Sequence, residues 1–408
     1  MLYKQRLLNF NNNEDINNVL SSVINDFKSE LNDGDDFESL RIASRKDDLE
    51  EINNFVKFIR VKFKKLLVLG IGGSSLGSKT LISVSKNKDV IFLENIDSEK
   101  VEDTFNSLDL RNTAVLTISK SGKTIECIAQ TLLLINIYKL KLGELSVKEH
   151  FFFLTETKES PLIKLSKHFD ITTIEHNKNI GGRFSYLSNV GLIPAAFAGL
   201  DILKIRQGAY ETINYFFEDE NFIKDIIYKQ NILYKNGIVG NILMTYHERL
   251  NSLLEWYRQL WAESLGKNGF GTLPIPAVGT IDQHSQLQLY LGGKKNLFFT
   301  FFVKKDNNQV LKISDSFVND FEYLKNRTID DIMTVEFNST VEILKQKDLP
   351  IRIFEYEKLN EKLISQFMMQ FIIETICVGK INNINPFGQP QVEEKKQIAR
   401  EIYKTWHS

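Results

Sequence analysis

The sequence has few cysteines and no long apolar run. Its 408 residues include only Cys127 and Cys377, which cannot form a disulfide framework and fit a reducing cytoplasm. The most apolar stretches, 131–138 and 297–303, are far shorter than the roughly 18 residues of a membrane helix. The opening MLYKQRLLNFNNNEDINN lacks the sustained apolar segment of a secretory signal. We therefore expect a cytoplasmic protein.

An excess of charge of one sign is also missing. Lys and Arg number 51 and Asp and Glu 52, which gives a formal net charge of −1. This balance argues against a protein that wraps nucleic acid or binds through an acidic tail. The length is sufficient for two or three domains with a large core. Composition alone therefore does not indicate whether the protein binds a small molecule.

Short apolar runs alternate with helical patterns through most of the chain. A polar, Asn-rich beginning is expected to form one or two surface helices, and the Gly/Pro-rich stretch 266–279 a loop. Strands are predicted at 65–70, 89–93, 113–118, 151–154, 171–174, 238–246, 296–303 and 351–356. This alternation predicts doubly wound, parallel sheets. We expect an α/β protein with an N-terminal helical arm, two α/β domains and a C-terminal segment with a helix: 1–58, 59–198, 199–384 and 385–408.

Two turns after predicted strands have the composition of a phosphate site. The first, Gly70–Ser75, is GIGGSS, and the second, Ser119–Thr124, is SKSGKT. Glycines allow close approach of the backbone to a ligand, while the second turn adds three hydroxyls, two ammonium groups and a helix N-terminus. Ligands collect at the carboxyl ends of parallel strands. The two turns together predict a site for a phosphate monoester.

Other interpretations of these turns remain. A glycine-rich turn alone is also typical of tight packing. A P-loop needs GxxxxGK[ST], but Ser78 separates Gly77 from Lys79. A dinucleotide fingerprint needs a glycine where Ser75 stands, although Glu94 lies where a ribose-binding acid would follow the second strand. The dinucleotide interpretation stays open as an alternative.

Three further segments contain candidate catalytic groups. Arg183 follows two glycines, so it either projects from a tight bend or lies solvated in a surface turn. Gln259 and Glu263 share one helical face near a helix C-terminus, where a carboxylate opposes the helix dipole; Glu263 is either a general base or a surface glutamate. His284 opens a predicted helix, and the histidines lack metal-site spacing such as HExxH, so no metal is expected.

Five ordered segments resemble the glucose-6-phosphate isomerase family: GIGGSSLG, ISKSGKTIE, GGRFS, AESLGKNG and GTIDQHSQLQLY. The resemblance runs from about residue 65 to residue 396. The second segment alone also resembles the phosphate loop of sugar-phosphate aminotransferases and sensors. The resemblance implies two sugar-isomerase (SIS) domains, a homodimer and no cofactor. It also implies reversible conversion of glucose 6-phosphate to fructose 6-phosphate through a cis-enediol.

The resemblance assigns binding roles to matching residues. Four would hold the substrate phosphate: Ser119, Lys120, Ser121 and Thr124. Gly73 and Ser74 would line the sugar, and Gln259 would position its chain. The second turn is thus expected to bind the phosphate and the first to line the sugar.

Catalytic roles are likewise implied by the resemblance. Glu263 would move a proton between C2 and C1, and Arg183 would stabilise the enediolate. His284 would assist ring opening, reaching the site from the partner subunit of the dimer. One carboxylate suffices for the isomerisation because the base returns the proton that it removes.

The C-terminal segment 385–396, NPFGQPQVEEKK, resembles the closing signature of the family. Gln389 matches its substrate-contacting glutamine. Lys396 matches the ring-opening lysine, with Lys395 as the alternative one residue away. The segment is thereby expected to complete the site.

Three residues depart from the family's pattern: Lys178, Gly388 and Gln391 stand where an acidic residue, Asp and Gly are usual. None of them replaces Glu263 or Arg183, so activity is expected. The sequence leaves two alternatives open. One is a dual glucose-/mannose-6-phosphate isomerase. The other is a non-catalytic sugar-phosphate-binding SIS protein, which would need no Glu263.

Overall fold

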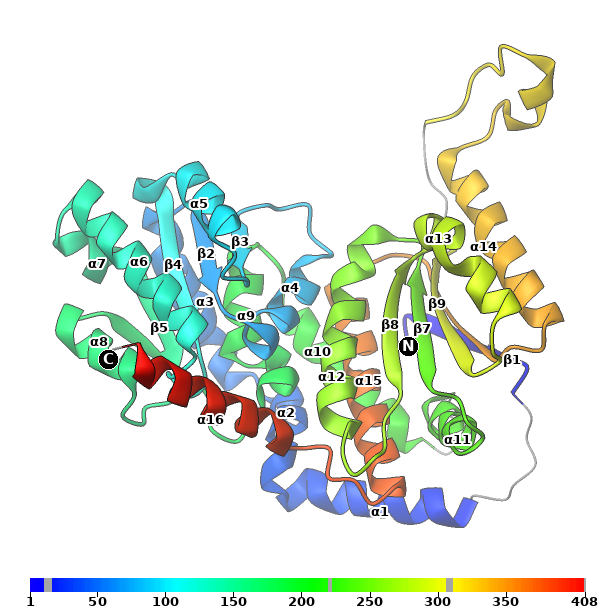
Figure 1. Ribbon diagram of the computed structural model, residues 1–408, viewed down its shortest axis with the longest axis horizontal. Coiled ribbons are helices and arrows are strands. Elements are labelled where there is room, and N and C mark those ends of the chain that lie inside the picture. The colour runs from blue at the N-terminus through cyan, green and yellow to red at the C-terminus, as the bar shows by residue number, and fades with distance from the viewer. Residues whose placement is uncertain (11–16, 219–221, 306–310, 407–408) are drawn as a thin grey trace.

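A computed structural model of the chain describes residues 1–10, 17–218, 222–305 and 311–406 (Figure 1). Its first sheet has five parallel strands in the order β3-β2-β4-β5-β6. These are β2 (Lys65–Leu69), β3 (Val90–Leu93), β4 (Thr113–Ile118), β5 (Phe151–Thr155) and β6 (Thr172–Glu175). The order reverses between β2 and β4, so the turns that follow these two strands flank the switch point where ligands bind. Both predicted phosphate-site turns occupy this position.

The second sheet has the order β1-β10-β9-β7-β8. Its strands are β1 (Tyr3–Leu8), β7 (Gly240–Thr245), β8 (Leu273–Val278), β9 (Leu297–Lys304) and β10 (Ile351–Tyr356). Strands β7 to β10 are parallel and repeat the order of the first four strands of the first sheet. Strand β1 runs antiparallel to β10. The predicted α/β class with doubly wound sheets is confirmed, but the second sheet is mixed.

The prediction of a purely helical N-terminal arm is wrong at its beginning, because β1 is an edge strand of the second sheet. Its partner lies almost at the other end of the sequence, so no local pattern indicates the pairing. Buried polar groups hold the strand: Arg352 Nε donates to Gln5 Oε1 at 2.8 Å, and the Tyr3 hydroxyl bonds to Gln370. The N-terminus is therefore part of the second α/β unit.

The loop expected over 266–279 contains strand β8, which the sequence analysis missed. Pro274 and Pro276 argue against a central strand, since proline has no N–H to donate. Strand β8 lies at the edge of its sheet and, among the described residues, pairs only with β7. The two prolines are two residues apart, so their nitrogens face the same, unpaired side.

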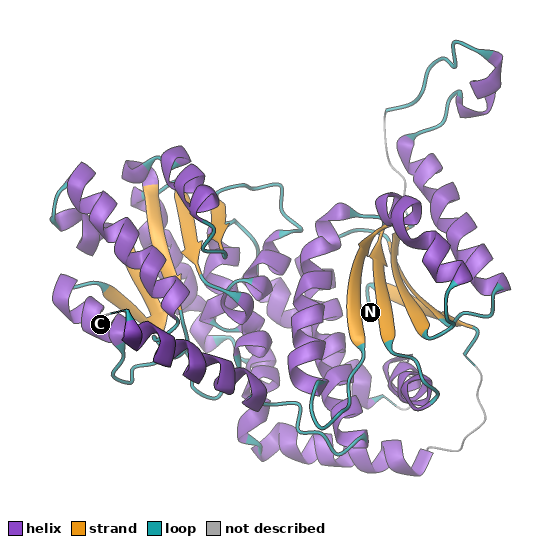
Figure 2. Cartoon of the chain, viewed as in Figure 1, coloured by secondary structure: helices purple, strands orange, loops and turns teal. Residues whose placement is uncertain are grey.

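Helices cover both sheets and fill the space between them (Figures 1 and 2). Helices α5–α8 pack on the outer face of the first sheet and α13 and α14 on that of the second. The bounds are α1 Asn17–Asp33, α2 Glu38–Arg41, α3 Asp47–Lys62, α4 Leu76–Ile82, α5 Ser98–Ser107, α6 Ile125–Leu142, α7 Leu145–His150, α8 Pro161–Phe169, α9 Asn189–Phe197, α10 Ile202–Phe217, α11 Phe222–Lys235, α12 Asn251–Leu265, α13 Gly279–Gly292, α14 Ile329–Gln346, α15 Glu361–Ile381 and α16 Pro390–Thr405.

One apolar core joins the two units. It includes Leu66 and Val68 of β2 and Phe302 and Phe354 of the second sheet, with α3, α4, α9, α10, α12 and α15 between them. Helix α15 is long and apolar enough to resemble a membrane span, but 89% of its most apolar window is buried in the protein. It is a core helix, and the shared core fixes the two sheets relative to each other.

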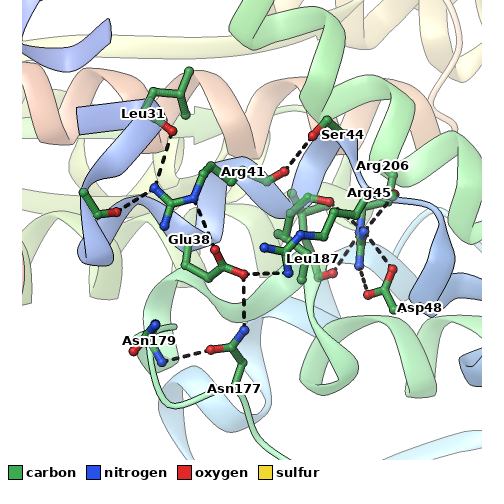
Figure 3. Close-up of polar contacts among 12 residues, drawn as sticks. Leu31, Glu38, Arg41, Ser44, Arg45, Asp48, Asn177, Asn179, Leu187 and Arg206 are labelled. Atoms are coloured by element: carbon green, nitrogen blue, oxygen red, sulfur yellow. Dashed lines mark hydrogen bonds and ion pairs between the residues drawn. The ribbon is translucent and has the colours of Figure 1, made fainter. Parts of the chain in front are cut away.

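The residues expected to form surface helices contribute to this core instead. Phe27 of α1 and Phe37, immediately before α2, are almost fully buried. Figure 3 shows how polar contacts attach this arm: Arg206 of α10 pairs with Asp48 at 2.6 Å and donates to the Leu187 carbonyl at 3.0 Å. The arm is thereby tied to the short helical turn Gly182–Leu187, which carries Arg183.

Candidate active site

The turn Ser119–Thr124 connects β4 to α6. The Ser119 and Thr124 hydroxyls are hydrogen-bonded at 2.9 Å. Gly122 has a φ of +61°, and a Cβ there would lie 2.2 Å from Ser160 Oγ, so no other residue fits. The turn is therefore held in one conformation at the N-terminus of α6, where backbone N–H groups favour an anion.

Lys120 links this turn to the segment before Arg183. Its ammonium donates to the carbonyls of Lys178 at 2.7 Å and Ile180 at 3.0 Å, and it lies 3.8 Å from Glu156. Burial lowers the pKa of Lys120. The Ser121 hydroxyl, in contrast, is on an exposed residue. Lys120 thus positions the turn, while its neighbour faces solvent.

The turn Gly70–Ser75 after β2 packs directly against the arginine segment. A Cβ on Gly73 would lie 2.3 Å from the Gly182 carbonyl carbon, and Ser185 Oγ donates to the Gly73 carbonyl at 3.2 Å. Ser74 is half-buried in the same turn. Glycine at position 73 therefore allows two backbones from different parts of the chain to touch.

We expect Gly73→Ala to lower turnover by about 10²-fold, because the added methyl group must displace the arginine segment and a shift near 1 Å can have that effect. Gly181→Ala is the matched control: its Cβ would lie 3.3 Å from one Phe184 ring carbon, a milder contact. Steady-state kinetics of both variants, with thermal unfolding to check folding, measure the difference. Equal activity of the two variants would contradict the importance of this contact.

Arg183 is buried, with 5% of its surface exposed. Its Nε donates to Ser264 Oγ at 2.7 Å, and its Nη2 donates to the Pro386 and Gly388 carbonyls at 2.7 and 3.0 Å. Burial lowers the pKa of Arg183 and nearby Glu263 opposes that shift. A guanidinium keeps its proton in such a site. The site therefore contains a fixed positive charge.

The remaining donor of Arg183 reaches the candidate base. Nη1 lies 3.3 Å from Glu263 Oε2 and 3.4 Å from Gln389 Oε1, so these contacts are weaker than those of Nε and Nη2. Gln259 Nε2 donates to the other oxygen, Glu263 Oε1, at 3.0 Å. Gln259 Oε1 is buried and has no hydrogen-bond partner among the described residues. Nη1, with its long contacts, is thus the donor of this group most available to a bound sugar.

Within the described part of a single chain, His284 and Lys396 are not brought to Arg183 and Glu263. His284 is exposed on α13, and no contact recorded within the described residues joins it to Glu263 or Arg183. Lys396 Nζ pairs with Glu393 at 2.6 Å on α16. Lys396 follows Gln389 by seven residues, about two helical turns, so both lie on one side of the helix. Lys395 lies on a different side.

The acid considered for a dinucleotide site is already occupied. Glu94 Oε1 accepts from Ser75 Oγ at 2.7 Å, and Glu94 Oε2 accepts from Lys79 Nζ at 2.9 Å. Both partners follow β2, so Glu94 stabilises the turn itself. This structural role accounts for Glu94 without ribose binding.

Two contributors to the site were missed by the sequence analysis, although both lie in the AESLGKNG segment. Ser264 orients Arg183, and Lys267 donates to carbonyls of the 385–388 segment. Lys267 follows Glu263 by four residues next to a helix end, and this spacing could have identified it as a neighbour of the site. The backbone acceptors of 385–388 could not be predicted from the sequence, because every residue has a carbonyl.

The fold and the site define a two-sheet α/β protein of the sugar-isomerase class, with one carboxylate and one arginine where its units meet. The sequence matches the family described as phosphoglucose isomerase over residues 53–408. The chain belongs to the phosphoglucose isomerase family.

Individual relatives agree with this assignment. The chain is 34% identical to a probable glucose-6-phosphate isomerase of Methanococcus maripaludis, with 95% of this chain and 89% of the relative covered. It is 33% identical to glucose-6-phosphate isomerase of Campylobacter jejuni, with 87% and 89% covered. A crystal structure of a hypothetical protein from Thermus thermophilus superimposes with a TM-score of 0.86 at 26% identity, covering 95% of each chain.

Proposed function

We propose that the protein catalyses the reversible isomerisation of glucose 6-phosphate and fructose 6-phosphate. The observation that carries the proposal is the Glu263 carboxylate, held between the Gln259 amide and the Arg183 guanidinium. A carboxylate serves as the base, and an arginine stabilises the negative charge that develops on the enediolate. A non-catalytic sugar-binding protein would not need this pair.

The test is a coupled assay that starts from fructose 6-phosphate and detects glucose 6-phosphate, in buffer containing a chelator and no added cofactor. We expect turnover under these conditions. The absence of any glucose 6-phosphate would contradict the proposal. Repeating the assay with mannose 6-phosphate measures whether the specificity is dual.

The substrate phosphate is proposed to bind the turn after β4, through Ser119, Lys120, Ser121 and Thr124. What supports this is the position of the turn beside the switch point and at the N-terminus of α6. Gly73 and Ser74 belong to the neighbouring turn after β2, on the side of Gln259 and Glu263. A phosphate bound at the turn after β4 provides remote binding energy that orients C1 and C2 of the sugar toward Glu263.

The chemistry then needs two stages. Ring opening requires proton donors and acceptors near O5 and O1, the role we assign to His284 and Lys396. Glu263 next removes the proton from C2, which the adjacent carbonyl acidifies, and returns it to C1. Arg183 Nη1, whose own contacts are long, donates to the substrate oxygen, while the bonds of Nε and Nη2 keep the planar guanidinium in place. Gln389, beside that donor, positions the sugar.

A homodimer is proposed to supply His284 from the partner subunit. Two exposed apolar residues, Ile281 and Leu289, lie on α13 with His284. The segment 311–328 projects from the body beyond α14 and exposes Phe317 and Tyr323 (Figure 1). Exposed apolar surface of this kind favours association with another copy.

Sedimentation of the pure protein tests the dimer, and mixing two inactive variants tests the shared site. If His284 acts across the interface, a heterodimer of His284→Ala and Glu263→Gln chains contains one intact site. After random exchange of subunits, about a quarter of the wild-type site number should be active. Each variant alone is the control, and no recovery on mixing would contradict the crossed arrangement.

A cytoplasmic location is also proposed. Cys127 and Cys377 are buried free thiols, which fits a reducing compartment. The sugar phosphate that we assign as substrate is charged at neutral pH and is typically retained inside cells. Fractionation with a specific antibody measures the location directly.

A further inference from the structure

Four consecutive carbonyls, those of residues 385–388, are held alternately by two cations. The bonds are Lys267 Nζ to Asn385 O at 2.6 Å and to Phe387 O at 2.8 Å, and Arg183 Nη2 to Pro386 O at 2.7 Å and to Gly388 O at 3.0 Å. Lys267 and Arg183 come from different elements, and both are buried. The segment 385–388 is thus clamped between them.

This clamp acts on the groups assigned to the reaction. Gln389 follows the segment directly, and its side chain contacts Arg183 Nη1, which also contacts Glu263. Without the carbonyls of 385–388, Arg183 Nη2 would lose both of its acceptors and the guanidinium could rotate. The Phe387 ring also packs against Phe184 at 5.3 Å and Phe37 at 5.8 Å, but these ring contacts hold one side chain and leave the four carbonyls to the two cations.

We propose that Lys267 is a positioning residue of the isomerase, which fixes the 385–388 segment and thereby orients Arg183 and Gln389 around Glu263. The proposal rests on the proposed function. Lys267 touches only backbone carbonyls of this segment, so its effect on catalysis is indirect. Its loss should lower turnover more than it weakens substrate binding, because the phosphate turn lies on other elements.

The charge of Lys267 makes the clamp sensitive to pH. Burial, and then repulsion by Arg183, lower the pKa of Lys267 to about 8, while Glu263 opposes the shift; these are the charged groups that face it. The 385–388 segment contributes carbonyls and no titratable side chain. Above pH 8 the ammonium becomes an amine, and its bonds lose their charge assistance. Turnover should therefore fall as the pH rises through about 8.

Unfolding would not explain such a fall. In an unfolded chain a lysine keeps its proton up to a pKa of about 10.4. Between pH 8 and that value the folded protein binds fewer protons at Lys267 than the unfolded chain does. The contribution of Lys267 to folding stability therefore rises with pH in this window. Activity and stability should move in opposite directions there, as far as this one group is concerned.

The experiment compares three variants. We expect Lys267→Met to lower kcat for fructose 6-phosphate about 10- to 30-fold with KM changed less than about threefold, and to remove the ionisation near pH 8. Lys267→Arg keeps a charge that does not titrate, so it should retain more turnover and show no fall near pH 8. Lys380→Met is the control: this lysine also lies beside the segment, but pairs with Glu30 at 2.6 Å. It should leave turnover within about twofold of wild type.

Hydrogen exchange of a peptide covering 383–391 tests the clamp independently of activity, and should be faster in Lys267→Met than in Lys380→Met. Wild-type turnover in Lys267→Met, or unchanged exchange, would overturn the proposal. If Lys267→Met does not fold, the pH profile of Lys267→Arg decides: an unchanged fall near pH 8 would overturn it. A wild-type chain without isomerase activity would instead contradict the proposed function, and the exchange experiment would still test the clamp.

Discussion

Glu263→Gln should lower kcat by about 10²- to 10⁴-fold, the range that a positioned general base contributes. Glutamine has the same shape: its amide oxygen can accept from Arg183, and its NH2 group can donate to Gln259 once the Gln259 amide is turned over. It cannot accept the proton that leaves C1 of fructose 6-phosphate or C2 of glucose 6-phosphate, however, so the chemical step stops while the substrate still binds. The expected Kd for fructose 6-phosphate, measured by calorimetry, stays within about threefold of wild type.

The matched control for this prediction is Glu255→Gln. Glu255 lies on the same helix, α12, and pairs with Lys79 at 3.3 Å, away from Arg183. Its replacement should change turnover by less than about twofold. A Glu263→Gln variant with normal turnover would remove Glu263 from the role of base. Weakened binding at normal kcat would make it a substrate-binding group instead.

Arg183→Lys should lower kcat by about 10²- to 10³-fold, with a smaller change in KM. Lysine preserves the charge, but a single ammonium cannot reach Ser264, the 385–388 carbonyls and Glu263 together. The developing negative charge on the enediolate then lacks a donor in the correct place, and buried carbonyls lose their partner. Steady-state kinetics with fructose 6-phosphate, at matched fractions of folded protein, measure the effect.

Arg206→Lys separates this effect from the general consequence of replacing a buried arginine. Arg206 is even less exposed than Arg183 and makes a comparable set of bonds, but to Asp48 and the Ile42 carbonyl of the N-terminal arm and to the Leu187 carbonyl, and none to Glu263 or the 385–388 segment (Figure 3). We expect it to lower Tm while turnover per folded molecule stays near wild type. If Arg183→Lys raised only KM, the role of Arg183 would be to bind the sugar in the ground state.

Much of the site could be predicted from the sequence because its chemistry is local. The turn Ser119–Thr124 contains its hydroxyls, its ammonium groups and its helix N-terminus within a few residues. Gln259 and Glu263 are brought together by helical spacing alone. Alternating strands and helices predicted parallel sheets, and the carboxyl ends of parallel strands place both glycine-containing turns at one sheet edge.

Other parts depended on contacts between distant residues. Strand β1 exists because of β10, and β8 tolerates two prolines because it lies at an edge. The N-terminal helices were predicted to lie on the surface, but they bury Phe27 against the shared core. The acceptors of Lys267 are backbone carbonyls, which every residue possesses, so no residue type indicated them.

The sequence by itself determined which groups are available and where each stands within its own element. It contained the carboxylate, the arginine and the predicted phosphate turn, because helical periodicity and turn chemistry depend on neighbouring residues. Only the tertiary structure brings Gly73 into contact with Gly182. It also determines that Arg183 Nε and Nη2 donate to Ser264 and the 385–388 segment, while Nη1 contacts Glu263 at a longer distance. These contacts arise from packing and hydrogen bonding between segments far apart in the chain. The separation of two such residues in sequence does not indicate their distance in space.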